Sequence, residues 1–251
     1  MDIKGSVAFV TGANRGLGRA FVEGLIESGA ARIYAAARVK ETLDDVIRKH
    51  GERIIPVTLD ITDSAAVYSA AEKAADVNLL VNNAGVACFE GFTTAGSLEA
   101  AHTEMNINYF GSLEMIRAFA PVLKDNGGGT IIQIASIASM VTFPVIGSYC
   151  ASKAALNALI YGARAELAAQ GTVVSGVYPG VVDTEMSARF DAPGVPPESI
   201  VSVTLEAVIK GEEDIYPDAM SQDLYRKAHQ QPKILERELS GMLPVASAAV
   251  S

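Results

Sequence analysis

The chain has 251 residues, a formal net charge of −9 and 49% hydrophobic residues. A chain this long and this apolar can bury a large core, which argues against an intrinsically disordered protein. The acidic balance argues against nucleic acid as a general partner, and no apolar run is long enough to span a membrane.

The two cysteines, Cys88 and Cys150, and the three scattered histidines indicate neither a disulfide framework nor a metal site. The N-terminus leads directly into a strand-like run and lacks the charged and apolar regions of a signal peptide. We therefore expect a cytoplasmic protein without a bound metal.

Short β-branched runs alternate with helical patterns along the chain. The predicted strands are residues 7–10, 32–37, 54–59, 77–81, 130–135, 173–178 and a short 214–216. The predicted helices are residues 17–26, 42–50, 64–75 with Ser64 as the N-terminal cap, 98–124, 149–169 and 198–210. Runs that are apolar on both faces and separated by helices predict an α/β fold. We expect a Rossmann-like, doubly wound parallel sheet of six to seven strands with helices on both faces.

The sequence contains no internal repeat, low-complexity stretch or linker. Residues 1–251 are therefore interpreted as a single dinucleotide-binding and catalytic domain. The small, apolar residues from about 244 to 251 are expected to form a short flexible tail.

A glycine-rich turn lies between the first predicted strand and the first predicted helix. It reads Thr11-Gly12-Ala13-Asn14-Arg15-Gly16-Leu17-Gly18. Glycines allow a tight turn and a close approach of the backbone to a pyrophosphate, and the helix N-terminus offers free N–H groups. In this context the turn predicts nucleotide binding.

Further motifs follow the later strands in a fixed order. They are Asp60, Asn82-Asn83-Ala84-Gly85, Asn108, Ser136, Tyr149-x-x-x-Lys153, Pro179-Gly180 and Thr184. With the G-x-x-x-G-x-G spacing of the turn, this series resembles the short-chain dehydrogenase/reductase family, in its single-domain branch of about 250 residues. The resemblance covers nearly the whole chain and implies an oxidoreductase.

The end of the second predicted strand bears on cofactor choice. NAD-specific sites place an acidic residue there, whereas this chain has Ala37 followed by Arg38. An arginine can bind a 2′-phosphate through paired, charge-assisted hydrogen bonds, and Arg15 in the glycine turn is a second cation for it. We therefore expect NADP(H).

The resemblance also implies a set of contacts to this cofactor. Asp60 and Ile61 would line the adenine, the Val182 backbone would hold the carboxamide, and Lys153 would bind the nicotinamide ribose. Asn82 is interpreted with equal weight as a structural amide that ties strands together. The implied cofactor-binding residues are Gly12, Asn14, Arg15, Gly16, Leu17, Gly18, Arg38, Asp60, Ile61, Asn83, Ala84, Gly85, Tyr149, Lys153, Pro179, Gly180, Val182 and Thr184.

Tyr149 and Lys153 lie four residues apart in a predicted helix, so their side chains project from one face. A free tyrosine has a pKa of about 10 and is a poor base near neutrality. The Lys153 ammonium, together with the positive charge of an oxidised nicotinamide, would favour the phenolate, and lowering the pKa by three units takes roughly 4 kcal/mol. We expect Tyr149 to be the acid/base that transfers a proton to or from the substrate oxygen.

Two further residues complete the predicted catalytic set. Ser136 ends the fifth predicted strand, where its hydroxyl could polarise the substrate oxygen. Ser139 remains an alternative, because it lies ten residues before Tyr149, the separation usual in the family. The resemblance assigns Asn108 to hold a water that relays protons from Lys153, and asparagine inside a helix suggests a local irregularity.

The residues expected around the substrate are mostly apolar, which predicts an apolar or aromatic carbonyl compound or alcohol. These residues are Ala87, Phe89, Met140, Thr142, Phe143, Val145 and the segment 185–190. Two other functions stay open: a catalytically silent NADP(H)-sensing protein, and a non-redox epimerase or dehydratase of the same fold. The family resemblance also implies a homodimer or homotetramer formed through the helices at 98–124 and 149–169.

Overall fold

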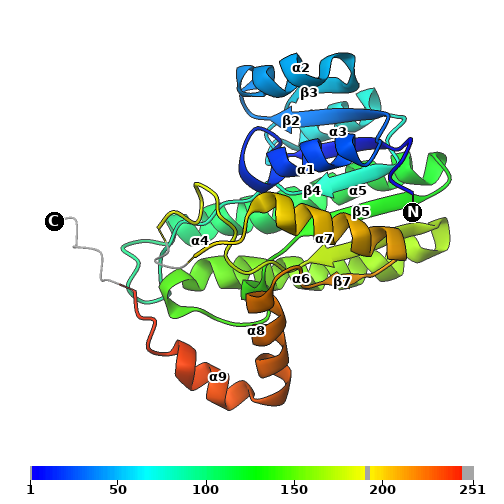
Figure 1. The fold of residues 1–251 in the computed structure, drawn as a ribbon. Helices are drawn as coiled ribbons and strands as arrows, with labels where there is room; N and C mark the ends of the chain where they lie inside the picture. Colours follow the sequence, from blue (N-terminus) through cyan, green and yellow to red (C-terminus); the bar gives the residue numbers. More distant parts are fainter. Residues whose placement is uncertain (1, 190–192, 245–251) are drawn as a thin grey trace.

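The structure is a computed structural model that describes residues 2–189 and 193–244, and its strands form one parallel sheet (Figure 1). The strands are β1 (Val7–Thr11), β2 (Arg32–Ala37), β3 (Ile54–Thr58), β4 (Leu79–Asn82), β5 (Gly129–Ile134), β6 (Thr172–Val177) and β7 (Asp214–Ile215). Their order is β3-β2-β1-β4-β5-β6-β7, and each neighbouring pair is parallel. The predicted doubly wound sheet is confirmed.

Helices connect these strands. The α-helices are α1 (Gly16–Glu27), α2 (Asp44–His50), α3 (Ser64–Lys73), α4 (Glu99–Glu104), α5 (Ser112–Asp125), α6 (Gly147–Leu167), α7 (Pro197–Lys210), α8 (Ala219–Gln230) and α9 (Pro232–Leu239). A π-helical segment, η3 (Met105–Gly111), joins α4 to α5. Short 3₁₀ helices are η1 (Lys40–Leu43), η2 (Gly51–Arg53), η4 (Ile137–Ser139), η5 (Pro144–Ile146) and η6 (Ala168–Gln170).

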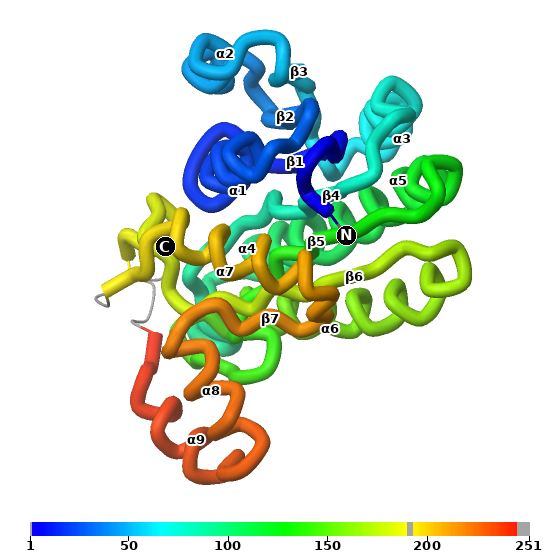
Figure 2. The backbone as a smooth tube through the Cα atoms, turned by 45° about the vertical axis from the view of Figure 1, so that its right-hand side comes forward, coloured from blue at the N-terminus to red at the C-terminus, as the bar shows by residue number. Residues whose placement is uncertain are grey.

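The sheet is buried on both faces, as its uninterrupted apolar strands predict. One core packs α1, α2 and α7 against the sheet, through residues such as Phe21, Leu25 and Val201. The other packs α3, α5 and α6 against the opposite face, around Phe119 and Leu156. Figure 2 shows these two groups of helices on either side of the strands. Among the described helices, none is both long enough and apolar enough to cross a membrane.

The long helix predicted over 98–124 is interrupted by η3, which contains Asn108. This segment is the irregularity that an asparagine inside the helix suggested. A second difference lies at α3, where Asp63, not Ser64, is the N-terminal cap and accepts a hydrogen bond from Ala66 N at 3.1 Å. Aspartate and serine cap equally well, so sequence alone did not separate two adjacent candidates.

Helices α8 and α9 were not predicted. Most residues of α8 are polar, so it lacks the wide apolar stripe that marks a helix in sequence. It is stabilised instead by a capping box between Asp218 and Ser221. Its few apolar residues pack, together with α9, against Ile137 and Val141, which follow β5 in the chain. Residues 245–251 of the predicted tail lie outside the described residues.

Two buried amides join β4 to β5, one strand away from the β1–β4 pair at which the strand order reverses direction. Asn82 Nδ2 donates to Gln133 Oε1 at 2.9 Å and to Ser112 O at 3.1 Å, and Gln133 Nε2 donates to Asn82 O at 3.1 Å. Both side chains are 1% exposed. Asn82 therefore makes the structural contacts that were one of its two interpretations, and it stabilises the sheet edge that carries the site.

We predict that Asn82→Ala lowers the free energy of unfolding by about 2–4 kcal/mol, because it leaves Gln133 Oε1 buried without the Asn82 donor and removes the tie from β4 to Ser112 O at the start of α5. Urea denaturation measures this value. The exposed Asn106→Ala serves as control and should change stability by less than about 0.5 kcal/mol. A loss below about 1 kcal/mol for Asn82→Ala would contradict the prediction.

Candidate active site

The glycine turn takes the tight form that its sequence predicts. Gly12 and Gly16 have φ angles of +65° and +52°, which favour glycine strongly. Gly18 leaves no room for a side chain, since an added Cβ would lie 2.1 Å from Gly12 O and 2.5 Å from Asn83 Nδ2. The first turn of α1 therefore packs directly on the backbone of Gly12, the residue after β1.

The turn is also bonded to the segment after β4. Asn83 Nδ2 donates to Thr11 O at 2.9 Å, and the N–H groups of Asn83 and Ala84 both donate to Thr11 Oγ1, at 2.8 and 3.0 Å. These bonds hold the ends of β1 and β4 together at the point where a doubly wound sheet binds its ligand.

The N-terminus of α1 suits an anion. Its cap residue, Arg15, makes no side-chain capping bond, and the first turn contains no acidic residue. The helix therefore offers its N–H groups and its positive dipole end to a bound group. Asn14 and Leu17 are half-buried, and Leu17 packs against the α1 core. A pyrophosphate suits these free N–H groups, and the tight turn that presents them requires glycine at position 18, where an added Cβ would collide with Gly12 O.

The far end of β2 carries the predicted phosphate-binding cation. Ala37 is buried at the strand end and Arg38 is exposed after it. Asp60 Oδ1 accepts hydrogen bonds from Thr62 N and Thr62 Oγ1 at 2.9 and 2.7 Å. These bonds, with a further contribution from the charge of Arg38, lower the pKa of Asp60. The following Ile61 is buried in the core, so its side chain packs inward.

Ser136 and Tyr149 meet at the carboxyl end of β5. Ser136 caps η4, and its Oγ accepts from Ala138 N at 3.1 Å. The Ser136 hydroxyl donates to Pro179 O at 3.5 Å and also interacts with the Tyr149 phenol, an interaction that acts to lower the phenol's pKa. Ser139 differs, because its hydroxyl donates to Ser136 O at 2.6 Å. The geometry thus favours Ser136 over Ser139 as the partner of Tyr149.

Lys153 is buried one turn further along α6. It is 4% exposed, its Nζ donates to Ile134 O at 3.1 Å, and Nζ lies 5.7 Å from the centroid of the Tyr149 ring. Asn108 approaches from η3, where its Nδ2 donates to Ser152 Oγ at 2.9 Å. The four predicted catalytic residues therefore converge from β5, η3 and α6.

Burial controls ionisation at this end of the site. It raises the pKa of Tyr149 above its ordinary value of 10.0, although the Ser136 hydrogen bond opposes the change. It lowers the pKa of Lys153 from 10.5 to about 8. In the protein alone, burial of the phenol outweighs the lowering of the Tyr149 pKa, which was expected with an oxidised nicotinamide beside it. Tyr149 is therefore a neutral phenol near pH 7.

The segment after β6 returns to the glycine turn. Pro179 O accepts from Ile137 N at 3.0 Å, and Gly180 N donates to Asp218 Oδ2 at 2.8 Å. Val182 forms an isolated bridge with Val195. Thr184 contacts the turn directly, since an added Cβ on Gly16 would lie 3.2 Å from its Cγ2. This segment connects the reaction end to the N-terminus of α1.

The model of the short chain dehydrogenase family matches residues 6–193. The chain belongs to the short-chain dehydrogenase family.

A structure of another member, a short chain dehydrogenase from Burkholderia cenocepacia in complex with NADP, is 44% identical, with a TM-score of 0.91. The match covers 95% of this chain and 99% of that one. A sorbitol dehydrogenase from Cereibacter sphaeroides is 34% identical over 76% of each chain. An NADP-dependent 3-hydroxy acid dehydrogenase from Schizosaccharomyces pombe is 26% identical over 87% of this chain and 92% of its own length.

Several contacts of this short-chain dehydrogenase were not foreseen from sequence. Glu185 forms an ion pair with Arg15 across the turn, and Arg189 stacks 5.4 Å above the Phe89 ring. Tyr149 packs in an apolar cluster with Phe89, Phe143 and others. Phe190, the last of the predicted substrate-side residues, lies outside the described residues. Charged residues in loops carry no periodic signal, so only the fold reveals their partners.

We predict that Lys153→Met stabilises the protein at pH 7 by about 2 kcal/mol, since it removes a desolvated ammonium but also a donor to Ile134 O. The unfolded chain keeps the lysine proton up to about pH 10.5, whereas folded Lys153 loses it near 8. The folded state therefore binds fewer protons between these values, and wild-type stability rises with pH there.

Chemical denaturation at pH 7 and pH 10 measures both effects, and the advantage of Lys153→Met should shrink at the higher pH. Lys210→Met, at an exposed lysine, is the control and should match the wild type at both values. A variant less stable than the wild type at pH 7 would show that the buried ammonium stabilises the fold.

Proposed function

We propose that this protein is an NADP(H)-dependent oxidoreductase that interconverts a carbonyl compound and the corresponding alcohol. The observation that carries the proposal is the contact between Ser136 and Tyr149 beside the buried Lys153, next to a glycine turn open to an anion. One sheet contains all the described strands, which supports the interpretation of the chain as one catalytic domain.

The residues present suit NADP(H) along the whole carboxyl edge of the sheet. The α1 N-terminus with Gly12, Gly16 and Gly18 would hold the pyrophosphate, and Thr184 would reach it from the other side. Arg38 and Arg15 would bind the 2′-phosphate, for which Arg15 must leave Glu185. The relatives named for NADP from Burkholderia cenocepacia and Schizosaccharomyces pombe support this choice.

The nicotinamide, when bound, supplies or accepts the hydride. Tyr149 Oη, neutral near pH 7, donates its proton to the substrate oxygen during reduction and takes it back during oxidation. Ser136 Oγ shares that oxygen and orients it, and the Lys153 ammonium stabilises the phenolate left behind. Asn108 holds the backbone of Val86 beside Lys153, and the family resemblance gives it the further role of holding a water that relays protons from Lys153.

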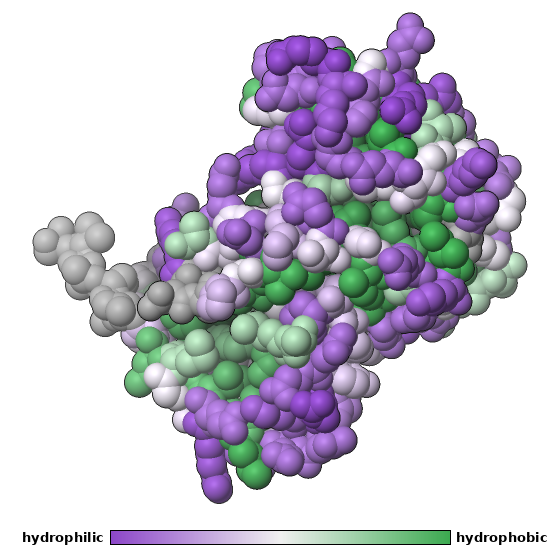
Figure 3. Space-filling model, viewed as in Figure 1, coloured by the Kyte–Doolittle hydropathy of each residue, from purple (hydrophilic) through white to green (hydrophobic). Residues whose placement is uncertain are grey.

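The substrate proposed is an apolar or aromatic ketone, aldehyde or secondary alcohol. Tyr149 packs against the buried cluster of Ala138, Ile146 and Cys150, as do Phe89, Phe143 and Val145, so its surroundings offer apolar contacts. Figure 3 shows apolar residues gathered around α7 and above α8, whereas the end around α2 is hydrophilic. This distribution of apolar and hydrophilic surface supports a site that is polar around the adenosine and apolar around the substrate.

We also propose a homodimer or homotetramer. Large apolar side chains are exposed along the helices that the family resemblance implicates: Leu98 at 69%, Phe110 at 52% and Tyr161 at 45%. Burial of such groups against a second copy is favourable at roughly 25 cal/mol per Å².

We predict that Tyr149→Phe lowers kcat at least about a hundredfold, because the proton donor is lost, while the Kd for NADPH changes less than about threefold. Absorbance of the reduced nicotinamide with a panel of ketones and alcohols measures turnover. Tyr161→Phe, on the same helix, is the control. Retained turnover would remove the assignment, and cofactor binding by the wild type without any turnover would favour the sensor.

We predict that Arg38→Ala raises the KM for NADPH about tenfold or more and the KM for NADH less than about twofold, since only the former carries a 2′-phosphate. Initial rates with both cofactors measure the two values. The exposed Arg48→Ala on α2 should leave both unchanged. Equal effects of Arg38→Ala on the two cofactors would contradict phosphate recognition by this residue.

A further inference from the structure

The loop after β4 runs beside α4 and η3 and is bonded to them by two side chains. Asn108 Oδ1 accepts from Val86 N at 2.9 Å, and its Nδ2 donates to Val86 O at 2.9 Å. Glu104 Oε1 accepts from Cys88 N at 2.7 Å. Two residues of one helical stretch, four apart, thus bind two residues of the loop that are two apart.

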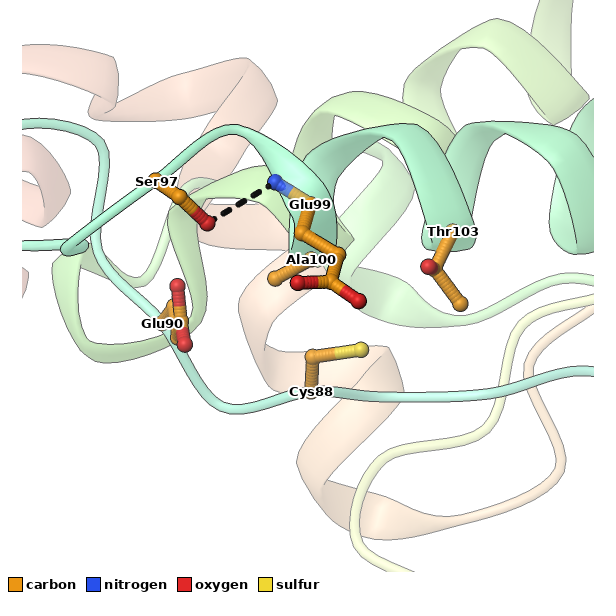
Figure 4. Close-up of a pocket in the computed structure, with 6 residues that line it drawn as sticks. All are labelled: Cys88, Glu90, Ser97, Glu99, Ala100 and Thr103. Atoms are coloured by element: carbon orange, nitrogen blue, oxygen red, sulfur yellow. Dashed lines mark hydrogen bonds between the residues drawn. The ribbon is translucent and has the colours of Figure 1, made fainter.

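This pairing has a simple geometric basis. N–H groups two residues apart in extended backbone are about 6.6 Å apart and point in the same direction. Glu104, the last residue of α4, and Asn108, in η3, lie four residues apart, close to one helical turn, so both side chains reach the loop from the same side. Glu104 and Asn108 therefore match successive N–H groups of an extended loop. In Figure 4 the loop at Cys88 passes Thr103 and Glu99 of α4, beside a hollow of about 250 Å³.

The burial of the Glu104 side chain lowers the stability of the folded protein. Its side chain is fully buried, and Oε2 has no hydrogen-bond partner among the described residues. A buried, half-satisfied carboxyl costs stability that an apolar residue of similar size would avoid. Its bond to Cys88 N is short, at 2.7 Å. The hydrogen bond that Glu104 accepts from the loop is the interaction that accompanies this loss of stability.

The residue after Cys88 is strained and lies at the substrate side. Phe89 has a φ of +64°, and among the described residues no other non-glycine residue has a positive φ. Such backbone conformations cost of order 1–3 kcal/mol and persist only where neighbours hold them. Phe89 packs in the same apolar cluster as Tyr149, and Arg189 stacks on its ring.

We propose that Glu104 is a positioning residue that, through Cys88 N, holds Phe89 beside Tyr149 and so determines the preference for bulky, apolar substrates. This inference rests on the proposed oxidoreductase function. Asn108 fixes the loop next to Lys153, and Glu104 fixes it next to the substrate. Glu104 thus acts on specificity, not on proton transfer.

Substrate selectivity tests the proposal. We define the selectivity as kcat/KM for an aromatic ketone divided by kcat/KM for a short aliphatic aldehyde, which is too small to need Phe89. Glu104→Leu removes the acceptor and should lower this ratio about tenfold. Glu104→Gln keeps an oxygen for Cys88 N and should retain the ratio within about threefold. Glu99→Leu, on the exposed side of α4, should match the wild type.

A double-mutant cycle separates positioning from general destabilisation, which would reduce both rates equally. Phe89→Ala alone should lower the ratio as Glu104→Leu does, and the double variant should show no further loss. Independent losses in the double variant, or an unchanged ratio in Glu104→Leu, would overturn the proposal.

A second readout does not depend on turnover. Hydrogen exchange of the peptide covering residues 84–90 should accelerate about tenfold in Glu104→Leu and remain near wild type in Glu104→Gln. Unchanged exchange in Glu104→Leu overturns the anchoring contact. A wild type that turns over no substrate removes the proposed function instead, and the exchange result then still decides whether Glu104 holds the loop.

Discussion

The removal of the Lys153 ammonium from water is the constraint on which the reaction end depends. Burial lowers the pKa of Lys153 to about 8, and the same burial keeps Tyr149 a phenol. Ile134 O, at the end of β5, accepts a hydrogen bond from Lys153 Nζ, and this bond offsets part of the cost of removing the ammonium from water. The end of β5, α6 and η3 must therefore lie next to one another. The strand order and the hydrogen bond between Asn82 and Gln133 fix the end of β5 in the place where this is possible.

The elements that sequence predicted best are those whose chemistry is local or periodic. The β2 run at 32–37 is apolar on both faces, and the structure has the same bounds. Gly12, Gly16 and Gly18 predict a tight turn, because the backbone angles or close contacts at these positions favour glycine. Tyr149 and Lys153 share a helix face through their spacing alone, which required no knowledge of the rest of the fold.

Other features depend on contacts between distant segments, which no local pattern encodes. The polar α8 is held by its cap at Asp218 and by a few apolar contacts to η4, so periodicity missed it. Ser136 and Ser139 are equivalent as hydroxyls, and the choice emerges only where Tyr149 lies. The direction of the Tyr149 pKa shift depends on burial, and Glu104 looks like an ordinary surface glutamate in sequence.

The position of α8 and α9 in the chain has a consequence for biogenesis. Chains fold as the ribosome releases them, N-terminal parts first. The glycine turn and its neighbouring strands emerge early, whereas the helices that support Ile137 and Val141 emerge only after all the described strands. Asp218, which accepts from Gly180 N, belongs to this late part. A nascent chain would thus form the glycine turn at residues 11–18 well before α8 and α9 pack against Ile137 and Val141, next to Ser136.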